Sequence, residues 1–277
     1  MSARLTEQQI RQLQEMVLLH YEQHGRHALP WRQTQDPYCI TVSELMLQQT
    51  QVDRVLAKYL TWLDVFPDWQ TLAHAPFRQV LQHWQGLGYN RRAQYLQQTA
   101  RIIQKEYQGA LPVERHPLLK LPGIGPYTAA AIRVFAFEQP DIVIETNIRT
   151  VYLHAFYPDE QHIHDQQLLP LIEQTLPKGN LREWYYALMD YGAMLKKAHP
   201  NPGRRSAHHT KQSAFIGSDR QVRGQILRLL TAKPLLSRKK IEQELHIDTD
   251  RLERILVRLT QDQLIARSKQ RYTIYQG

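Results

Sequence analysis

The stretch "LPGIGPYTAAAI", residues 121–132, decides the fold that we expect for this chain. Two glycines, Gly123 and Gly125, follow a proline at a spacing of two and are themselves followed by Pro126. A turn of this kind directs backbone N–H groups outward at the start of a helix, where they can bind a phosphate oxygen without contacting a base. A plain turn between two helices is the alternative. The small residues after the turn favour close packing of the second helix, so the stretch predicts a helix–hairpin–helix motif.

The composition indicates the class of partner. The chain has 277 residues, a formal net charge of +9 and a sequence pI near 9.6, a balance that favours a polyanionic partner such as nucleic acid. No run of about eighteen apolar residues predicts a membrane span, and the N-terminus has no signal-peptide pattern. We therefore expect a cytoplasmic monomer without a membrane partner, associated with the nucleoid if the source is bacterial.

Cys39 is the only cysteine of the sequence. One cysteine excludes disulfides within the chain, cysteine-based zinc sites and a four-cysteine iron–sulfur cluster. The histidines His199, His208 and His209 lack the spacing of metal ligands with carboxylates or thiols. The sequence therefore predicts no metal site.

Helical patterns occupy most of the first 195 residues, because apolar residues recur every three or four positions and Gly or Pro closes each pattern. Convincing alternating strands are missing from this part, so we expect it to be all-α. The expected helical segments are residues 6–24, 41–66, 76–86, 90–108, 166–176 and 181–197, besides the two helices of the motif.

The C-terminal part has a different composition. Residues 196–218 are rich in Pro, Gly and Ser, lack acids and include Arg204, Arg205 and Lys211, which predicts a basic linker over the protein surface or along a phosphate backbone. Residues 219–277 read as three helices followed by a two-stranded hairpin, the pattern of a winged helix-turn-helix domain. Its third helix would expose the basic side chains Arg251, Arg254 and Arg258. A protein-contact module is the alternative.

The stretch "DIVIETNIRTV", residues 141–151, places Glu145 at the start of an apolar-periodic segment. From spacing alone, the stretch favours a helix N-terminus with Thr146 or Asn147 as the N-cap and an acid near the positive end of the helix dipole.

Four stretches together carry a resemblance to a known family. They are "LPWRQTQDPYCITVSELMLQQTQV" (29–52), "GLGYNRRAQYL" (86–96), the stretch 121–132 and "ALMDYGAM" (187–194). In order and spacing they resemble the MutY-type adenine DNA glycosylases of the helix–hairpin–helix superfamily, and more distantly the endonuclease III branch. The resemblance covers roughly residues 8–195.

The resemblance implies a mainly α, two-lobed fold that binds DNA across a cleft. The domains expected on this basis are an N-terminal helix at 1–21 that packs with the second lobe, a six-helix lobe at 22–136 and the second helical lobe at 137–195. The linker at 196–218 and the winged helix-turn-helix at 219–277, expected from composition and pattern, complete the chain.

The resemblance also implies catalytic roles. Glu145 matches a carboxylate that stabilises the cationic sugar formed when the glycosidic bond breaks, and Asn147 matches an asparagine that orients water or that carboxylate. Glu44 matches the general acid that protonates the departing base, with a pKa raised by its apolar neighbours. Tyr127 stands where bifunctional relatives carry a Schiff-base lysine, which implies a monofunctional enzyme.

Further matching positions would contact DNA. Gln48, Gln49 and Thr50 match the wedge that enters the base stack during base flipping, and Tyr89 matches a stacking tyrosine. Backbone contacts are expected at Gly123, Gly125, Pro126, Arg204 and Arg205. The pocket for the extrahelical base is expected at Leu29, Trp31, Arg32 and Tyr186.

The sequence also departs from the family pattern. Glu-Thr-Asn replaces Asp-Gly-Asn at 145–147, and the four cluster cysteines that usually follow "MDYGAM" are missing. The winged helix stands in place of the Nudix-like domain that reads 8-oxoguanine. Tyr186 replaces the usual Gln or Glu of the base pocket. We expect no cofactor, although the helix–hairpin–helix could bind a monovalent cation.

The expected function is a monofunctional DNA glycosylase that flips a mispaired or damaged base out of double-stranded DNA and hydrolyses its glycosidic bond in base excision repair. Adenine from a mismatch is the first candidate. Tyr127 and Tyr186 leave open a thymine or uracil mismatch glycosylase. A non-catalytic DNA-binding protein on the same fold is a third reading. An abasic-site lyase is disfavoured by the missing lysine, and the opposing base stays open.

Overall fold

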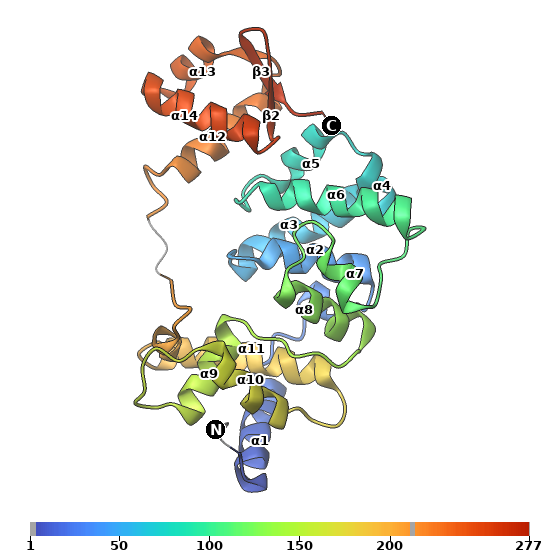
Figure 1. The fold of residues 1–277 in the computed structure, drawn as a ribbon, viewed down its shortest axis with the longest axis vertical. Helices are drawn as coiled ribbons and strands as arrows, with labels where there is room; N and C mark the ends of the chain where they lie inside the picture. The colour runs from blue at the N-terminus through green and yellow to red at the C-terminus, as the bar shows by residue number, and fades with distance from the viewer. Residues whose placement is uncertain (1–3, 211–213, 277) are drawn as a thin grey trace. The chain divides into compact units, whose positions relative to one another are not determined.

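The computed structural model describes residues 4–210 and 214–276. The described chain is mainly α-helical and divides into two compact units (Figure 1). Unit 1 comprises Met1–Ile40, Val113–Arg115 and Gly125–Gln212, and unit 2 comprises Thr41–Pro112, His116–Ile124 and Ser213–Gly277. The lobe expected at 22–136 is therefore shared between the two units.

Unit 1 is built around helix α11. In the described structure α11 packs against α9 and α1, and α9 also contacts α10 and the 3-10 helix η2 (Figure 1). Its core contains buried side chains from each of these α-helices. The elements of unit 1 are α1 (Glu7–His24), η1 (Pro30–Arg32), α8 (Pro126–Phe137), α9 (Thr146–Phe156), α10 (Asp165–Gln174), α11 (Leu181–Ala198) and η2 (Pro202–Arg205).

Helix α1 shows how local sequence sets these elements. Thr6 and Gln9 form a capping box at its start, which satisfies backbone donors that have no partner within the helix. Leu13, Val17 and Tyr21 recur at helical spacing and are buried in the core of unit 1. The helix predicted at 6–24 is therefore confirmed.

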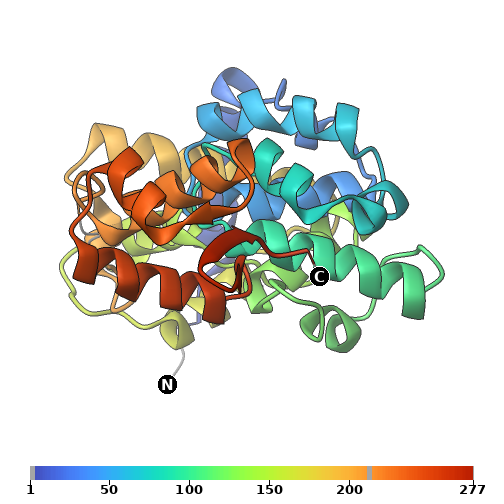
Figure 2. The ribbon, with the colours of Figure 1, turned by 90° about the horizontal axis from the view of Figure 1, so that it is seen from above.

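Unit 2 contains a second helical cluster, in which α6 packs against α4 and α5 (Figures 1 and 2). Trp62 and Trp84 meet edge to face in its core, with ring centroids 5.4 Å apart. Helices α2 (Pro37–Leu47) and α7 (Arg115–Leu119) cross the division between the units. The remaining helices of this cluster are α3 (Val52–Val65), α4 (Trp69–His74), α5 (Phe77–Trp84) and α6 (Arg91–Glu106).

The structure differs from the expected helices at two places. The segment 41–66 is not one helix, because α2 ends at Leu47 and α3 begins at Val52, with Gln49 in the left-handed region at φ 54° between them. Helix α4 was not predicted from the sequence. It has six residues and an N-cap at Asp68, too short a segment to show a helical period.

The C-terminal part of unit 2 contains three helices and a small sheet. The helices are α12 (Asp219–Ala232), α13 (Arg238–Leu245) and α14 (Thr249–Gln261), and the strands are β1 (Leu236–Ser237), β2 (Ile265–Ser268) and β3 (Arg271–Ile274). The strands pair antiparallel in the order β1-β3-β2, with Ile265 opposite Ile274 and Leu236 opposite Tyr272. Strand β1 was not predicted, because two residues cannot show alternation.

The expected surface linker is largely part of unit 1. Helix α11 continues to Ala198, and Pro202 and Gly203 of η2 are buried. Ser206 forms an isolated parallel bridge with Ile163. The segment packs because Gly203 has no side chain: a Cβ there would lie 2.9 Å from Thr150 Oγ1. Lys211 lies outside the described residues.

No helix in the described ranges 4–210 and 214–276 is both long and apolar enough to cross a membrane.

Candidate active site

An extended segment leads the chain to Glu145 and is held in place by a buried tyrosine. The hydroxyl of Tyr185, from α11, accepts a hydrogen bond from Val143 N at 3.1 Å and donates one to Asp141 O at 2.9 Å. Burial raises the pKa of Tyr185 to about 12, so the hydroxyl keeps its proton. The carboxylate of Asp141 pairs with Arg115 and Arg133. The segment that precedes Glu145 is therefore held through its main chain by Tyr185 and through the side chain of Asp141 by two arginines.

Glu145 itself is the N-cap of α9. Its Oε1 accepts hydrogen bonds from the backbone N–H groups of Asn147 at 2.7 Å and Ile148 at 2.9 Å, while Asn147 Nδ2 donates to Oε2 at 3.3 Å. The expectation of Thr146 or Asn147 as the N-cap is therefore wrong. The glutamate side chain, one methylene longer than aspartate, curls back onto the helix start and brings its negative charge to the positive end of the dipole.

The protonation of Glu145 reflects opposing influences. Burial raises the pKa of its carboxyl, whereas the amide of Ile148, the ammonium of Lys196, the amide of Asn147 and the guanidinium of Arg149 act to lower it. The net pKa lies above the ordinary value for a glutamate. The donors around the carboxylate favour the anion, and burial decides how far the pH must rise before it forms.

The helix that carries Glu145 and Asn147 is braced on its other side. Arg149 donates to both oxygens of Asp165 at the start of α10, at 2.6 and 2.8 Å. His208, from the segment after η2, lies 3.7 Å from the same carboxylate. This network ties α9 to α10 and to the C-terminal end of unit 1.

Two further catalytic candidates lie on other helices. Glu44 is in α2 within unit 2, only 5% exposed and next to the buried Leu45 and Met46. Tyr127 is the second residue of α8 in unit 1 and packs against the core of that unit. The structure thus brings Glu145 and Asn147 into contact, with Tyr127 in the same unit and Glu44 in the other.

The predicted wedge, Gln48, Gln49 and Thr50, forms the turn between α2 and α3. It is organised by Arg92, a buried residue of α6 that the sequence did not single out. The guanidinium donates to main-chain oxygens and one hydroxyl at 2.6 to 3.2 Å: the carbonyls of Leu45, Met46, Gln48, Leu87 and Gly88, and Thr50 Oγ1. Burial lowers the pKa of Arg92 to about 10, which leaves it charged at neutral pH.

Tyr89 belongs to the same assembly. It has a left-handed backbone at φ 45°, its side chain is 40% exposed, and Arg92 Cζ lies 5.5 Å from its ring centroid. Its hydroxyl accepts a hydrogen bond from the Arg220 guanidinium of α12 at 3.1 Å. Arg92 therefore connects the wedge turn and the Tyr89 turn, and the stacking candidate remains accessible at the surface of unit 2.

The hairpin at 121–126 has the geometry that its glycines predict. Gly123 is left-handed at φ 79°, and a Cβ there would lie 2.9 Å from Tyr95 Cβ. Thr99 Oγ1 donates to Pro122 O at 2.9 Å and fixes the turn from α6. Gly125 is the N-cap of α8, and Pro126 is its first residue. The N-terminus of α8 thus follows directly on a tight, glycine-dependent turn.

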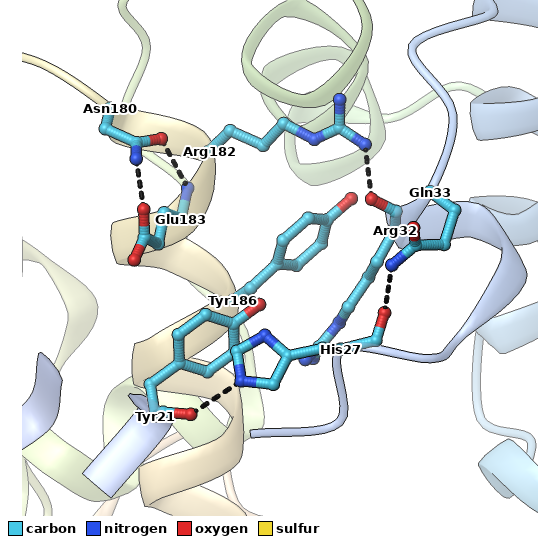
Figure 3. A pocket seen from close by; sticks show the side chains of 8 residues that line it. All are labelled: Tyr21, His27, Arg32, Gln33, Asn180, Arg182, Glu183 and Tyr186. Carbon is cyan, nitrogen blue, oxygen red and sulfur yellow. Dashed lines mark hydrogen bonds between the residues drawn. The ribbon is translucent and has the colours of Figure 1, made fainter. Parts of the chain in front are cut away.

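A pocket of about 320 Å³ lies in unit 1 between the N-terminal segment and the start of α11 (Figure 3). Two of the four expected pocket residues, Arg32 and Tyr186, line it, while Leu29 and Trp31 are buried. The full lining consists of Tyr21, His27, Arg32, Gln33, Asn180, Arg182, Glu183 and Tyr186. It is polar and charged, with hydrogen-bond donors and acceptors on both sides.

Tyr186 and Arg32 hold each other in fixed positions. The Tyr186 ring stacks on the Phe135 ring with centroids 4.5 Å apart. Arg32 Cζ lies 4.5 Å from the centroid of the Tyr186 ring. Arg32 is also paired with the buried Asp190, at 2.7 and 2.9 Å, and Arg26 pairs with Asp190 as well. Burial alone would raise the pKa of Asp190, but the two guanidinium groups hold it below its ordinary value. The faces of the Tyr186 ring are therefore already in contact with protein.

The remaining basic candidates differ in how free they are. Arg204 is exposed, whereas Arg205 donates to Leu153 O at 2.9 Å and to Pro158 O, and so helps to hold η2 against α9. In α14, Arg254 and Arg258 are exposed. The expectation that Arg251 is exposed beside them is wrong, because its guanidinium donates to Asp219 and to Gly217 O.

The residues of this chain do not match the four-cysteine iron–sulfur cluster that the resemblance implies. The sequence has one cysteine, Cys39, and within the described residues no three His, Cys, Asp or Glu side chains are grouped to hold a metal ion. In the segment after Met194, Lys196 Nζ donates to Asn147 Oδ1 at 2.8 Å and Gly203 lies against Thr150. This segment offers an ammonium group and a packed backbone in place of thiolate ligands.

The comparison with family models identifies the chain. The model of the HhH-GPD superfamily of base excision DNA repair proteins matches residues 42–247. The chain belongs to this superfamily.

Several curated relatives of this HhH-GPD protein are adenine DNA glycosylases. That of Mycobacterium tuberculosis H37Rv is 32% identical over 285 residues, which cover 93% of this chain and 92% of the relative. That of Mycolicibacterium smegmatis is 35% identical over 77% of this chain and 78% of the relative. That of Buchnera aphidicola subsp. Baizongia pistaciae is 35% identical over 182 residues, and the matched part spans about half of its length, 52%. The MutY-type resemblance and the expectation of a DNA glycosylase are confirmed.

Solved structures agree on the fold. A thermostable thymine-DNA glycosylase matches with a TM-score of 0.61 and 27% identity, over 68% of this chain and 87% of that one. A non-covalent endonuclease III–DNA complex matches with a TM-score of 0.55 and 21% identity, over 78% of this chain and 92% of that one. The mainly helical glycosylase fold is therefore confirmed.

Proposed function

We propose that this protein is a monofunctional DNA glycosylase that excises adenine from a mismatch in double-stranded DNA and leaves an abasic site. The observation that carries the proposal is the carboxylate of Glu145, half-buried at the N-terminus of α9 with Asn147 bound to it. An anion fixed before charge develops is what an oxocarbenium-like transition state requires. The similarity to adenine DNA glycosylases over nearly the whole chain supports adenine as the base.

The proposed reaction divides the work between two carboxyl groups. Glu44 donates its proton to the departing base as the bond from the base to C1′ breaks, and the base leaves with the bonding electron pair. Glu145 stabilises the positive charge that develops on the sugar. Water then bonds to C1′ and returns its proton to Glu44. Tyr127 cannot form a Schiff base, so strand cleavage by that route is not part of the proposal.

The proposed DNA contacts follow from the exposed and organised turns. The wedge Gln48–Thr50 and Tyr89 enter the base stack, and the amides around Gly123, Gly125 and Pro126 bind a phosphate. Arg204 contributes a further phosphate contact. Arg205, whose guanidinium is bound to main-chain carbonyls, acts through the packing of η2 instead. The polar pocket beside Arg32 is the proposed site for the flipped base.

Residues 219–277 are proposed to form a winged helix-turn-helix domain that adds contacts to duplex DNA. The order of three helices and a three-stranded antiparallel sheet supports this, as do Arg254 and Arg258, which are exposed on α14. The domain is anchored to the helices of unit 2, where Arg78 donates to Thr231 O at 2.8 Å and Gln94 to Gln263 O at 3.0 Å. Binding of another protein by α14 is the alternative.

The other properties proposed for the protein concern cofactors and assembly. We propose a cytoplasmic monomer without an iron–sulfur cluster, in which a monovalent cation could bind the backbone carbonyl oxygens of the hairpin at 121–126. No step of the proposed reaction depends on that cation.

Single-turnover base release tests the proposed function. The duplexes would contain adenine opposite 8-oxoguanine, adenine opposite guanine, thymine opposite guanine, or uracil opposite guanine. We expect release of adenine, slowed on the order of 100-fold or more in both Glu44→Gln and Glu145→Gln, and an abasic product that stays uncleaved until alkali is added. Tight binding without release from any duplex would contradict the enzyme and favour the non-catalytic reading. Covalent trapping with borohydride would contradict the monofunctional mechanism.

A thymine or uracil mismatch glycosylase is the second candidate. The similarity to the thymine-DNA glycosylase structure and to a thymine/uracil-DNA glycosylase of Methanothermobacter thermautotrophicus, 29% identical over 65% of this chain, supports it. Tyr186 also supports this candidate, because its ring is held by Phe135 and Arg32 and its side chain lacks the amide or carboxylate that would bind an adenine edge. Release of thymine or uracil in the same experiment would decide for this candidate.

A further inference from the structure

Lys196 lies in the last turn of α11 and reaches the catalytic candidates of α9. Its Nζ donates to Asn147 Oδ1 at 2.8 Å, and Asn147 in turn donates to both oxygens of Glu145. The side chain is half-buried, whereas the next residue, Lys197, is exposed. Lys196 is therefore hydrogen-bonded to Asn147, one of the two residues on which the proposed function rests.

We propose that Lys196 is a positioning residue of the proposed glycosylase reaction, which fixes the side-chain amide of Asn147 and through it the carboxylate of Glu145. This rests on the proposed function and adds a residue to its machinery. Lys196 occupies the segment where relatives of the MutY type supply cluster cysteines, and here it supplies a cation to the active site instead.

The ammonium group of Lys196 selects the orientation of the Asn147 side-chain amide. An asparagine side chain can turn its oxygen or its nitrogen toward a neighbour, and only the hydrogen-bond network selects between them. Lys196 Nζ has only hydrogens to offer, so it faces Oδ1, and Nδ2 is then directed at Glu145 Oε2. Without the lysine, the amide could turn Oδ1 toward the carboxylate, where the two oxygens would repel each other.

The packing of α11 against α9 places the lysine beside Asn147. Gly192 lies four residues before Lys196, so the two positions share one face of the helix. A Cβ at Gly192 would lie 2.1 Å from Asn147 O, which means that the backbones of α11 and α9 touch at this point. From the other side, the Cβ position of Gly203 is 3.9 Å from Lys196 Cε. The lysine stem is thus enclosed by a close helix contact and by η2.

The charges around Lys196 also link it to Glu145. The positive end of the α9 dipole repels a cation, and burial lowers the pKa of Lys196, while Glu145 raises it. A lysine in this place is stabilised chiefly by the carboxylate that it faces through Asn147. Arg149 adds positive charge from α9 but is itself paired with Asp165 of α10, near His208. Of these two cations, Lys196 is therefore the one whose partners, Asn147 and Glu145, are both catalytic candidates.

The experiment compares Lys196→Met, Lys196→Arg and the neighbouring control Lys197→Met. Single-turnover base release would be measured with enzyme in excess, from acid to alkaline pH, on the duplex that the wild-type protein cleaves. We expect Lys196→Met to slow release roughly tenfold at neutral pH, the loss of one hydrogen bond to a charged group. We also expect the acid limb of its pH profile to move to higher pH. Lys196→Arg should recover most of the rate, and Lys197→Met should match wild type.

Two controls separate a positioning role from other roles. Binding of Lys196→Met to a non-cleavable duplex should be unchanged, because the lysine does not contact DNA in the proposal. Its thermal unfolding should also be unchanged, because the proposed role is in positioning and not in the fold. In the background of Asn147→Ala, the same substitution should cost much less than in wild type, because the two residues act in series.

The outcomes are distinct from those of the proposed function. No base release by the wild-type protein would overturn the function itself. Release by wild type that is unchanged in Lys196→Met, or lowered equally at every pH with the acid limb in place, would overturn the positioning role and leave the function standing.

Discussion

The end of α2 and the start of α9 are both helix termini organised by a cation, and the two cations do different work. At the end of α2, Arg92 donates to carbonyl oxygens that have no partner within the helix, where a positive charge also suits the dipole. At the start of α9, Lys196 approaches the end of a helix that repels it and meets Asn147 rather than the backbone. Arg92 follows the electrostatics of its helix, whereas Lys196 opposes them.

The difference between Arg92 and Lys196 distinguishes a cation that stabilises the fold from one that indicates a functional site. A buried cation that satisfies main-chain carbonyls stabilises the fold, and its removal should be visible in unfolding. A cation that is held in place by a half-buried carboxylate indicates that the ionised form of that carboxylate has a function at this site. The following predictions test this distinction, beginning with the largest effect.

Substitution of Arg92 should affect stability most. Arg92→Met leaves several buried carbonyl oxygens without a donor, and we expect the free energy of unfolding to fall by about 3 kcal/mol or more. Urea denaturation measures it. The control is Arg91→Met, because Arg91 is half-exposed and its ion pair with Asp262 should contribute less than about 1 kcal/mol. Equal stability of the two variants would remove the structural role assigned to Arg92.

Substitution of Glu145 should affect the reaction and not the fold. Glu145→Gln keeps an oxygen that can accept the backbone hydrogen bonds of the cap, but it loses the charge, so we expect base release to fall on the order of 100-fold. Unfolding should be little changed. Glu145→Asp retains the charge and should retain more activity than the Gln variant. If all three proteins released base at the same rate, the start of α9 would be a structural cap like the end of α2.

The contact between α11 and α9 predicts an intermediate effect. Gly192→Ala places a Cβ against Asn147 O, and we expect a loss of about 1–3 kcal/mol in the free energy of unfolding, together with slower base release. The matched control is Gly224→Ala in α12, where nothing lies within 4 Å of the added Cβ. That change should stabilise the protein by about 0.5–1 kcal/mol. A neutral Gly192→Ala would mean that α9 is free to move away from α11.

The pH dependence should separate Glu145 from Asp190. Burial raises the pKa of Glu145, so activity should fall as the pH drops through a value above that of an ordinary glutamate, while the contribution of Glu145 to stability grows in the same range. The pKa of Asp190 is lowered by Arg32 and Arg26, so its stabilising effect persists above the ordinary aspartate pKa and is lost only at lower pH. Activity and urea denaturation measured over the same pH series would show the two transitions. Coincident transitions would contradict the assignment.

The smallest effect is expected at the surface of the η2 segment. Arg204→Ala should weaken DNA binding and make the negative slope of log binding constant against log salt shallower by about 0.9, the loss of one phosphate contact. Arg205→Ala should instead lower the unfolding temperature, because its guanidinium is bound to Leu153 O and Pro158 O. Salt titrations and thermal unfolding of both variants would distinguish the two arginines.

The sequence allowed much of the fold to be predicted, because its helices are amphipathic and end at clear signals. The helix at 6–24 is confirmed, and the turn at Gly123 follows from a pattern that requires a left-handed backbone. The break at Gln49 could not be predicted in this way, since Gln carries no turn signal and the turn is bound at the Gln48 carbonyl by Arg92, which is distant in sequence. Strand β1 is too short to show a period.

The candidate site was predicted less completely. Glu145 and Asn147 were found because they lie two positions apart in the sequence, where they align with the carboxylate and the asparagine of a family motif, and the structure brings them into contact. Lys196 was assigned to a basic linker, because nothing in "MLKKAHPNPGRR" distinguishes it from Lys197. Only the close approach of α11 and α9 at Gly192 shows which of the two lysines is directed inward.

The hydroxyl of Tyr185 gives the protein a built-in reporter. Because it accepts the N–H of Val143, that amide is removed from solvent two residues before Glu145. Its hydrogen–deuterium exchange should be slow as long as the segment stays seated on α11, and should quicken when the segment opens, without any label or substrate. A single exchange rate would then report local opening next to Glu145, separately from the global unfolding of the chain.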